Sequence, residues 1–295
     1  MKVTFHTDPA EFLAIARPGL AGDPVVGSVV ATTTERAAGE RAAGVPAPTH
    51  PHWWATVTDA DTVIGLAMRT AAQPPYPLFV LPMPDDAARL LAGSLRDRGE
   101  HPGGCNGALP AARVFADETV RLWGGASEIA QHTRLFECRE VVRPPAVPGV
   151  LRRAEVSDAE LVLDWCAAFH RDAQEQAGRD PDRGFGPDPD RVRRAITAGG
   201  YWLFTDPDGR PVHLTGTGPP AFGVVRIAPV YTPKRDRGRG VASHVVAELT
   251  ARHLADRLRM CLFTDQANPT SNKIYEAIGY RRVVDMANVG ITPAG

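Results

Sequence analysis

The sequence predicts an α/β (α+β) protein made of two copies of one unit. Residues 3–5 have the pattern of a strand, and residues 7–13 that of a capped helix start. The same plan recurs further along the chain, where a strand at 151–154 precedes a helix start at 157–161. Between the copies, residues 143–149 hold three prolines and a glycine, which cannot continue a helix or a central strand.

Each copy continues with a hairpin whose first strand begins with aromatic residues. The first hairpin spans residues 53–67 and turns at 59–61, and the second spans 201–214 and turns at 206–209. A chain of 295 residues has room for two domains of ordinary size. We therefore expect three segments: an N-terminal domain at 1–143, a linker at 144–149 and a C-terminal domain at 150–295.

Composition narrows the function classes. The 33 Lys and Arg residues nearly balance the 34 Asp and Glu, which argues against nucleic-acid or membrane partners. No apolar stretch is long enough to span a bilayer, and the first residues lack the profile of a secretion signal. The four cysteines contain no Cys-x-x-Cys pair, so we expect free thiols, a cytoplasmic location and no metal site. Frequent Ala, Arg, Gly and Pro suggest a bacterial source.

The segment 237–242, Arg-Gly-Arg-Gly-Val-Ala, is the most informative part of the chain. It follows an apolar strand at 224–231, and apolar residues recur four apart from Val241, which predicts a helix start. A helix N-terminus aims unpaired N–H groups and about half a positive charge at one point, and glycines let a diphosphate approach. A basic surface turn is the alternative. Walker and dinucleotide loops do not fit, because the required lysine is absent and Ser243 replaces the third glycine.

This segment resembles the pyrophosphate-binding signature Arg-x-x-Gly-x-Ala of the GNAT superfamily of acyl-CoA-dependent N-acyltransferases. A buried strand is expected at 260–264, and the residues after it resemble the second GNAT signature. The matching residues are Asn268, Ile274, Tyr275, Ile278, Gly279 and Tyr280, whereas Ser271 replaces the usual alanine. The resemblance covers roughly residues 150–285. It implies two tandem GNAT-like domains, each a mixed, mostly antiparallel sheet flanked by helices, with the acyl-CoA signatures in the C-terminal one.

The equivalent junction in the N-terminal half differs. A strand at 78–81 enters a helix through residues 82–86, Pro-Met-Pro-Asp-Asp. This junction has no glycine, lacks two amide N–H groups and carries two carboxylates, so it would repel a diphosphate. We therefore expect a degenerate GNAT-like domain that serves as scaffold or as one wall of the substrate cleft. Residues 21–50 are expected to be a flexible excursion within it.

The resemblance implies acetyl-CoA as acyl donor. The loop amides would bind its diphosphate. Arg237 and Arg239 would add positive charge near the phosphates; the alternative for each is a solvated arginine on the loop surface. The end of the strand before the loop would pair with the pantetheine arm in a slot between two splayed strands, and Val230 would polarise the thioester carbonyl. The expected cofactor-binding residues are Val230, Tyr231, Thr232, Arg237, Gly238, Arg239, Gly240, Val241, Ala242, Ser243, Asn268 and Ser271.

Acyl transfer also needs a neutral amine and a proton for the departing thiolate. The resemblance assigns the proton to Tyr275, and a core tyrosine on its helix is the alternative. GNAT enzymes commonly use a carboxylate as base, but the strand at 224–231 has none. Asp265 is the nearest candidate, with a turn or helix-capping role as the alternative. His213 is a further option that also fits a structural role.

Acceptor recognition is expected from the less regular parts of the C-terminal half. A helix at 161–176 and an acidic loop at 180–190 border the acceptor slot in GNAT folds. The helix supplies three substrate candidates, Trp165, Phe169 and Asp172, with solvated surface as the alternative. A cleft lined by carboxylates would attract a cationic amine.

The sequence thus predicts an acetyl-CoA-dependent N-acetyltransferase acting on the primary amine of a metabolite, amino acid derivative or antibiotic, as a monomer or homodimer. One alternative is a non-catalytic acyl-CoA-binding sensor or partner module, which the missing strand carboxylate favours. Another is a tandem-GNAT biosynthetic synthase similar to mycothiol synthase.

Overall fold

The computed structural model describes residues 1–176, 178 and 186–294. Contacts divide the chain into two compact units: Met1–Leu135 with Val283–Gly295, and Phe136–Arg282. This division differs from the expected sequential one, because the last strand joins the first unit and the expected linker lies inside the second.

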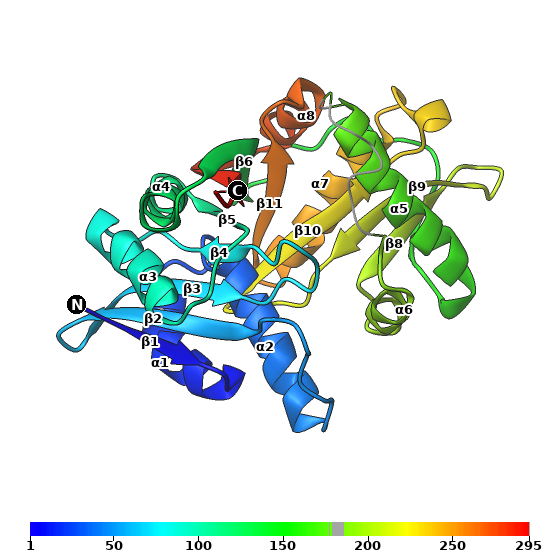
Figure 1. Ribbon diagram of the computed structural model, residues 1–295. Helices are drawn as coiled ribbons and strands as arrows, with labels where there is room; N and C mark the ends of the chain where they lie inside the picture. Colours follow the sequence, from blue (N-terminus) through cyan, green and yellow to red (C-terminus); the bar gives the residue numbers. More distant parts are fainter. Residues whose placement is uncertain (177, 179–185, 295) are drawn as a thin grey trace. The chain divides into compact units, whose positions relative to one another are not determined.

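The first unit alternates strands with helices (Figure 1). Its elements are β1 (Lys2–His6), α1 (Pro9–Gly22), α2 (Ser28–Ala42), β2 (Trp53–Asp59), β3 (Thr62–Arg69), β4 (Leu78–Val80), α3 (Asp85–Asp97), β5 (Gly104–Ala108), α4 (Ala111–Trp123), β6 (Ala126–Cys138) and β12 (Tyr280–Thr292). The helix start predicted at 7–13 is present, with the Asp8 carboxylate accepting the Ala10 N–H at 2.8 Å.

The sheet of the first unit has the strand order β1-β2-β3-β4-β5-β12-β6. Strands β1 to β4 pair antiparallel, and β4 pairs parallel with β5. Strand β12, from the C-terminal end of the chain, pairs antiparallel with β5, and its residues Met286–Gly290 lie opposite Gly104–Ala108. Ala287 and Val289 of β12 are buried in the same core as Leu91 of α3, which explains why the end of the chain belongs to this unit.

Residues 21–50 do not form the flexible excursion that composition predicts, since half of them belong to helix α2. Val30, Ala31, Thr34 and Ala37 are buried on one side of this helix. The last three residues lie one, four and seven positions after Val30, a spacing that places all four on a single helical face. The alanines and threonine of this segment, whose abundance suggested flexibility, therefore form a surface that packs against the core.

The second unit also alternates strands with helices. Its elements are β7 (Val150–Arg153), the 3₁₀ turn η1 (Val156–Asp158), α5 (Ala159–Gln176), α6 (Pro189–Thr197), β8 (Tyr201–Thr205), β9 (Pro211–Thr217), β10 (Val224–Tyr231), the 3₁₀ turn η2 (Lys234–Asp236), α7 (Val241–Ala255), β11 (Arg259–Asp265) and α8 (Pro269–Ile278). Every strand that the sequence predicts in this half is present within two or three residues of its expected bounds.

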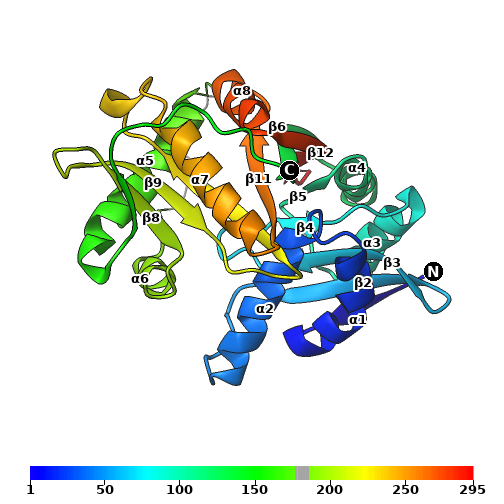
Figure 2. The ribbon, with the colours of Figure 1, turned by 180° about the vertical axis from the view of Figure 1, so that it is seen from behind.

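The two units share one plan. In the second unit β7 to β10 pair antiparallel in chain order, and β10 pairs parallel with β11, as β1 to β5 do in the first. Helix α5 lies on one face of this sheet and α7 on the other (Figures 1 and 2). The fold is therefore α/β with two tandem units, each a mixed and mostly antiparallel sheet flanked by helices.

Two segments were expected to be irregular. In the expected linker, residues 144–149 form no helix or strand, and Val147 packs against the cluster that contains Val241 and Val245 of α7. In the expected acidic loop, residues 180–185 lie outside the described residues, and Pro189 and Asp190 begin α6. The Asp188 carboxylate caps that helix by accepting the Asp190 N–H at 3.0 Å.

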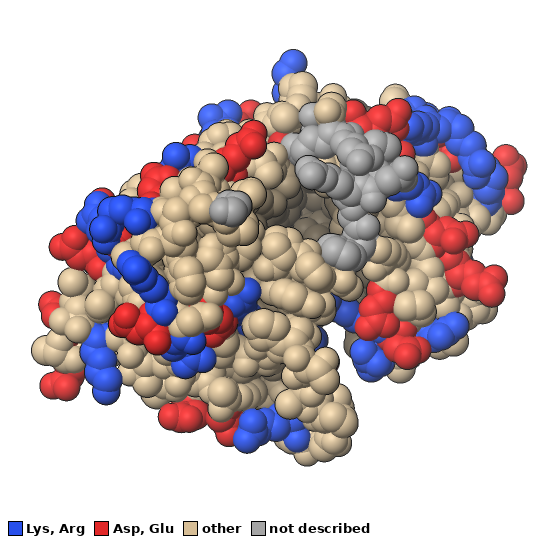
Figure 3. Space-filling view, in the orientation of Figure 1, with Lys and Arg blue, Asp and Glu red and all other residues tan. Residues whose placement is uncertain are grey.

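Charged side chains of both signs are interspersed over the face of the molecule shown in Figure 3. This matches the near balance of 33 basic and 34 acidic residues. Within the described ranges, none of the helices combines the length and the apolar character that crossing a bilayer requires.

Candidate functional site

Strands β10 and β11 separate beyond a short paired region. Their register joins Val224–Arg226 to Arg259–Cys261, although β10 continues to Tyr231 and β11 to Asp265. The pairing of β10 with β9 also shifts between Ile227 and Val230. The sequence predicts a splayed strand pair here, and this geometry leaves one edge of the last residues of β10 available to a ligand.

The glycine-rich segment follows β10 and leads directly into α7. Gly240 is the residue before the helix and has a φ of 76° and a ψ of 2°, and Gly238 has a φ of 78°. Side chains with a Cβ rarely adopt these angles. No side chain caps the first turn of α7, so its N–H groups face the space beyond the loop.

A pocket of about 560 Å³ lies where the end of β10, the glycine loop, α5 and the first turns of α8 meet. Its volume is in the range of small-ligand sites. All twelve residues expected to bind the cofactor line this one pocket: Val230, Tyr231, Thr232, Arg237, Gly238, Arg239, Gly240, Val241, Ala242, Ser243, Asn268 and Ser271. The fold therefore brings together two signatures that lie about 30 residues apart in the chain.

Arg237 is held by two partners from different elements. Its Nη2 donates to the Asp172 carboxylate of α5 at 2.6 Å, and its Nε donates to the Thr232 carbonyl oxygen at 2.9 Å. The Tyr231 hydroxyl also donates to Asp172, at 3.4 Å. Asp172, expected to face a substrate amine, lines the pocket with its charge already paired, and it ties α5 to the loop.

Asp236 is a second carboxylate in the pocket wall, and no sequence motif indicated its role. It is 2% exposed, and Nη2 of Arg210 donates to it at 2.8 Å. Arg235 and Arg239 approach the same carboxylate at 3.3 and 3.5 Å. Hydrogen bonding from Arg210 lowers the pKa of Asp236, so the carboxylate stays ionised. Only folding brings Arg210 to it, from a hairpin 26 residues earlier.

The basic groups around the loop outnumber the acidic ones. The charged residues joined there by ion pairs are Arg210, Lys234, Arg235, Arg237 and Arg239 with Asp172, Glu175, Asp206 and Asp236. The excess is one positive charge. Together with the helix N-terminus, this excess favours an anionic ligand.

His213 is fully buried on β9, outside the pocket. Its Nδ1 shares a hydrogen bond of 2.7 Å with the Thr232 hydroxyl, and its Nε2 shares one of 2.7 Å with the Thr215 hydroxyl. Burial lowers the pKa of His213 to about 3, so the ring is neutral. The histidine thus positions Thr232 in the pocket wall, and both of its nitrogens are engaged.

Tyr275 lines the pocket from α8 and is 8% exposed. Its ring packs edge-on against Tyr280 with centroids 6.0 Å apart. Among the described residues, no hydrogen-bond partner of its hydroxyl is found. Burial raises the pKa of Tyr275, so the phenol remains protonated at neutral pH. The arrangement presents a hydrogen-bond donor to the pocket.

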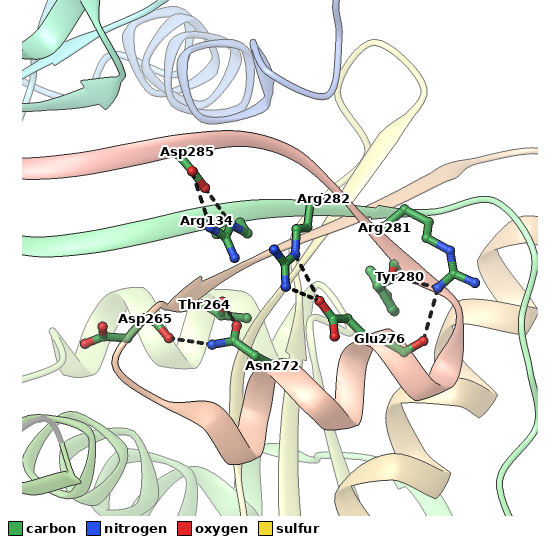
Figure 4. A network of polar contacts seen from close by, with 9 residues as sticks. All are labelled: Arg134, Thr264, Asp265, Asn272, Glu276, Tyr280, Arg281, Arg282 and Asp285. Carbon is green, nitrogen blue, oxygen red and sulfur yellow. Dashed lines mark hydrogen bonds and ion pairs between the residues drawn. The ribbon is translucent and has the colours of Figure 1, made fainter.

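The start of α8 is fixed by local hydrogen bonds (Figure 4). The Asn268 carboxamide oxygen accepts the Ser271 N–H at 3.0 Å, and its Nδ2 donates to Gln176 of α5 at 2.9 Å. Figure 4 shows Asn272 between Thr264 and the Asp265 carbonyl oxygen, to which its Nδ2 donates at 3.2 Å. These bonds tie α8 to the end of β11.

Asp265, the weaker catalytic candidate, is not among the residues that line the pocket. Its carboxylate accepts the Ala267 N–H at 2.9 Å, which is the turn-forming role that the sequence left open. The two carboxylates that do line the pocket, Asp172 and Asp236, are both paired with arginines. A base for the amine is therefore not assigned from the described residues.

The substrate candidates on α5 fall in different places. Phe169 and Asp172 line the pocket, whereas Trp165 does not. Trp165 packs against the Tyr231 ring with centroids 6.1 Å apart and supports the pocket wall from behind.

The equivalent junction of the first unit has a different geometry. Pairing of β4 with β5 extends to Val80, the last residue of β4, so the strands do not separate within β4. Met83 is 8% exposed and occupies the space beside Gly65 of β3. Asp85 and Asp86 stand at the start of α3 and pair with Arg89. Over the described part of the chain, neither unit contains a group of three or more potential metal ligands.

Comparisons with known proteins agree with this fold. Residues 223–288 match the model of the family described as FR47-like protein. No curated protein was found to match the sequence. Solved structures match over the full chain. An acetyltransferase of the GNAT family from Colwellia psychrerythraea has a TM-score of 0.60 at 8% identity, covering 99% of this chain and 100% of its own.

Two further structures cover both units. A Drosophila protein has a TM-score of 0.66 at 12% identity, over 99% of each chain. A tandem GNAT protein from the clavulanic acid biosynthesis pathway has a TM-score of 0.56 at 14% identity, over 100% of this chain and 99% of its own. The chain is therefore a tandem protein of the GNAT fold, with the FR47-like match in and just beyond its second unit.

Proposed function

We propose that the protein is an acetyl-CoA-dependent N-acetyltransferase that acts on the primary amine of a small molecule. The observation that carries this proposal is the single pocket in which the end of β10, the glycine loop and Tyr275 of α8 meet. The GNAT fold supports acyl transfer in general, and the acceptor and donor are inferred from the residues of the pocket.

The chain's own residues would divide the work of binding. The N–H groups at the start of α7 and the net positive loop suit a diphosphate. The free edge of β10 near Val230 suits an extended amide-containing arm, which pairs with strand backbone. Acetyl-CoA carries both groups and supplies the acetyl thioester.

Tyr275 would act at the departing sulfur. Because burial raises the pKa of its phenol, Tyr275 is a weaker acid than the thiol it faces. It therefore stabilises the developing thiolate mainly by donating a hydrogen bond, a contribution of about 10²–10⁴ in rate. The first unit, whose β4–α3 junction lacks a glycine loop, would serve as scaffold.

A non-catalytic acyl-CoA sensor is the second candidate. The observation in its favour is that Asp172 and Asp236, the carboxylates in the pocket wall, are engaged by arginines and leave no evident base. Such a protein would bind acetyl-CoA without turnover.

Two measurements on the full-length protein separate these functions. Calorimetric titration with acetyl-CoA is expected to show saturable binding, and free-thiol release with a panel of primary amines is expected to show turnover. Binding with no turnover on any amine would favour the sensor. Absence of acetyl-CoA binding would refute both.

A further inference from the structure

Arg226 occupies the point at which β10 and β11 begin to separate. It is the last residue of β10 in register with β11, where it lies opposite Cys261. Val230, the residue expected beside the thioester, lies four positions further along the same strand. At roughly 3.3 Å per residue, the two Cα atoms are at most about 13 Å apart.

The strand pattern tells which face of the sheet Arg226 occupies. Its neighbours Val225 and Ile227 are buried in one core with Val246 and Ala247 of α7. Alternation along the strand places Arg226 on the opposite face, which α5 covers (Figures 1 and 2).

The register shift in β10 keeps the pocket on this same face. Because the shift inserts an extra residue between Ile227 and Val230, Tyr231 returns to the α5 face. Tyr231 accordingly packs with Val162 of α5 and lines the pocket. Arg226 and the Tyr231 wall of the pocket thus share one face of one strand.

The Arg226 guanidinium is short of hydrogen-bond partners. Its Nη1 is buried and lacks a partner within the described parts of the chain, although the side chain as a whole is partly exposed. A buried N–H group without a partner is costly, more so when it carries charge.

Among the residues described in the structure, no ion pair joins Arg226 to a carboxylate. Burial is the main cause that lowers the pKa of Arg226. The Cys261 thiol, opposite Arg226 on β11, acts against this shift, and Arg191 of α6 acts with it. Such a place favours an incoming anion.

We propose that Arg226 binds a carboxylate of the acceptor, so that the substrate is an amine that also carries a carboxylate. This inference rests on the proposed function and specifies its substrate class. A carboxylate accepts two parallel N–H groups from a guanidinium and would satisfy the buried Nη1. Arg226 is not itself among the residues that line the pocket, so the carboxylate end would lie beyond the pocket, where β10 and β11 begin to separate, and the amine end toward Val230.

Matched acceptor pairs test this substrate class. Free-thiol release is measured for 4-aminobutyrate, lysine and phenylalanine, each against its carboxamide, with wild type and the Arg226→Met variant. We expect wild type to prefer the carboxylate member of at least one pair by about 100-fold in kcat/KM, and the variant by less than about tenfold. Arg193→Met is the control, since Arg193 is an exposed arginine of α6 paired with Asp190, and it should keep the wild-type preference.

A binding measurement decides the matter if none of these amines is acetylated. Without ligand, Arg226→Met should raise Tm by about 2–4 °C, because it removes an unpaired buried charge. Sodium formate should raise the Tm of wild type and of Arg193→Met more than that of Arg226→Met. A lower Tm for Arg226→Met, or equal stabilisation of all three proteins by formate, would overturn the inference.

These outcomes are separable from those of the proposed function. A protein that does not bind acetyl-CoA refutes the function itself. A protein that binds acetyl-CoA and acetylates amines without a carboxylate preference, or with the same preference in Arg226→Met, refutes only the role of Arg226.

Discussion

Asp172 of α5 and Arg237 of the glycine loop form a hydrogen-bonded ion pair of 2.6 Å between Oδ2 and Nη2. Both side chains line the pocket. The pair connects the helix expected to border the acceptor to the loop expected to bind the diphosphate. Arg237 also donates to the Thr232 carbonyl oxygen, so one guanidinium fixes the loop against both the helix and the end of β10.

Loss of this ion pair should weaken acetyl-CoA binding. We expect Asp172→Asn and Arg237→Gln each to raise the Kd by about tenfold, equivalent to roughly 1.4 kcal/mol. The double variant should be scarcely worse than either single one, because both remove the same contact. Calorimetric titration measures all three. Asp190→Asn is the control, as Asp190 is exposed and pairs with Arg193 of α6, and neither residue lines the pocket. Additive losses would show that Asp172 does not act through Arg237.

Gly240 is needed both for its backbone angles and for the open approach to the start of α7. An added Cβ would meet only Val147, at 3.7 Å, so space exists for a side chain at this position. Gly240→Glu should raise the Kd for acetyl-CoA by more than about 100-fold, through blocked approach and charge repulsion.

Gly209 provides the matched control. Its φ of 79° is close to the 76° of Gly240, and it has open space around it in the β8–β9 turn, away from the pocket. Both variants should lose about 1–2 kcal/mol of stability, because each forces a side chain into left-handed backbone angles. Gly209→Glu, unlike Gly240→Glu, should bind acetyl-CoA normally. Equal binding by the two variants in calorimetry would remove the loop from the ligand site.

Tyr275→Phe should reduce turnover without weakening the binding of acetyl-CoA. Removing the phenol oxygen removes the hydrogen bond to the departing sulfur but leaves the packing against Tyr280 in place. We expect kcat to fall by about 10²-fold or more and the Kd to change less than twofold. Tyr280→Phe is the comparison, because it removes a buried hydroxyl that shares a hydrogen bond with Thr250. That variant should lose stability and keep its kcat. Unchanged turnover in Tyr275→Phe would end the proton-donor assignment.

His213 should make stability depend on pH. Its ordinary pKa of 6.5 applies to the unfolded chain, and burial lowers the folded value to about 3. Below pH 6.5 the unfolded state binds the proton and the folded state does not, so stability falls as pH falls toward 3. Above pH 6.5 this contribution is fully present. The expected loss is roughly 1.4 kcal/mol per pH unit.

Denaturant unfolding of wild type and His213→Gln at pH 7, 6 and 5 measures this contribution. Glutamine has hydrogen-bonding groups for Thr215 and Thr232 but does not titrate. The stability difference between the two proteins should narrow as pH falls. Parallel curves would mean that His213 is protonated in the folded state.

The last strand should be essential to the first unit. Val289 of β12 is 3% exposed in the core that contains Leu78 and Phe115. Val289→Asp should cost about 3 kcal/mol or more, because it buries an unpaired charge among apolar groups. Val283→Asp in the same strand is the control, since Val283 is 39% exposed and should change stability by less than about 0.5 kcal/mol. Thermal unfolding compares the two, and similar losses would contradict the assignment of the strand to this core.

Local pattern was sufficient to locate the strands and the binding loop. The apolar run at 224–231, the two glycines and the recurrence of apolar residues from Val241 gave β10, the loop and the start of α7 within one residue. These features depend on neighbouring residues, through helix capping and backbone angles. The GNAT resemblance added the role of α8, and the structure places all of the expected cofactor residues around one pocket.

Composition alone misled where packing decides the structure. The Ala- and Thr-rich residues 28–42 form a helix because a buried face exists for them to contact, and that face is not visible in their own sequence.

By itself, the sequence determined the two-unit plan, the order of the strands and the glycine loop, because these follow from periodicity, turns and glycines. Tertiary structure alone decided that β12 completes the first unit and that Asp172 and Asp236 are paired with arginines. It also decided that Nη1 of Arg226 is buried without a hydrogen-bond partner among the described residues. The physical reason is distance along the chain. Ion pairs and the pairing of β12 with β5 join residues separated by 26 to 186 positions, and no local pattern specifies such partners.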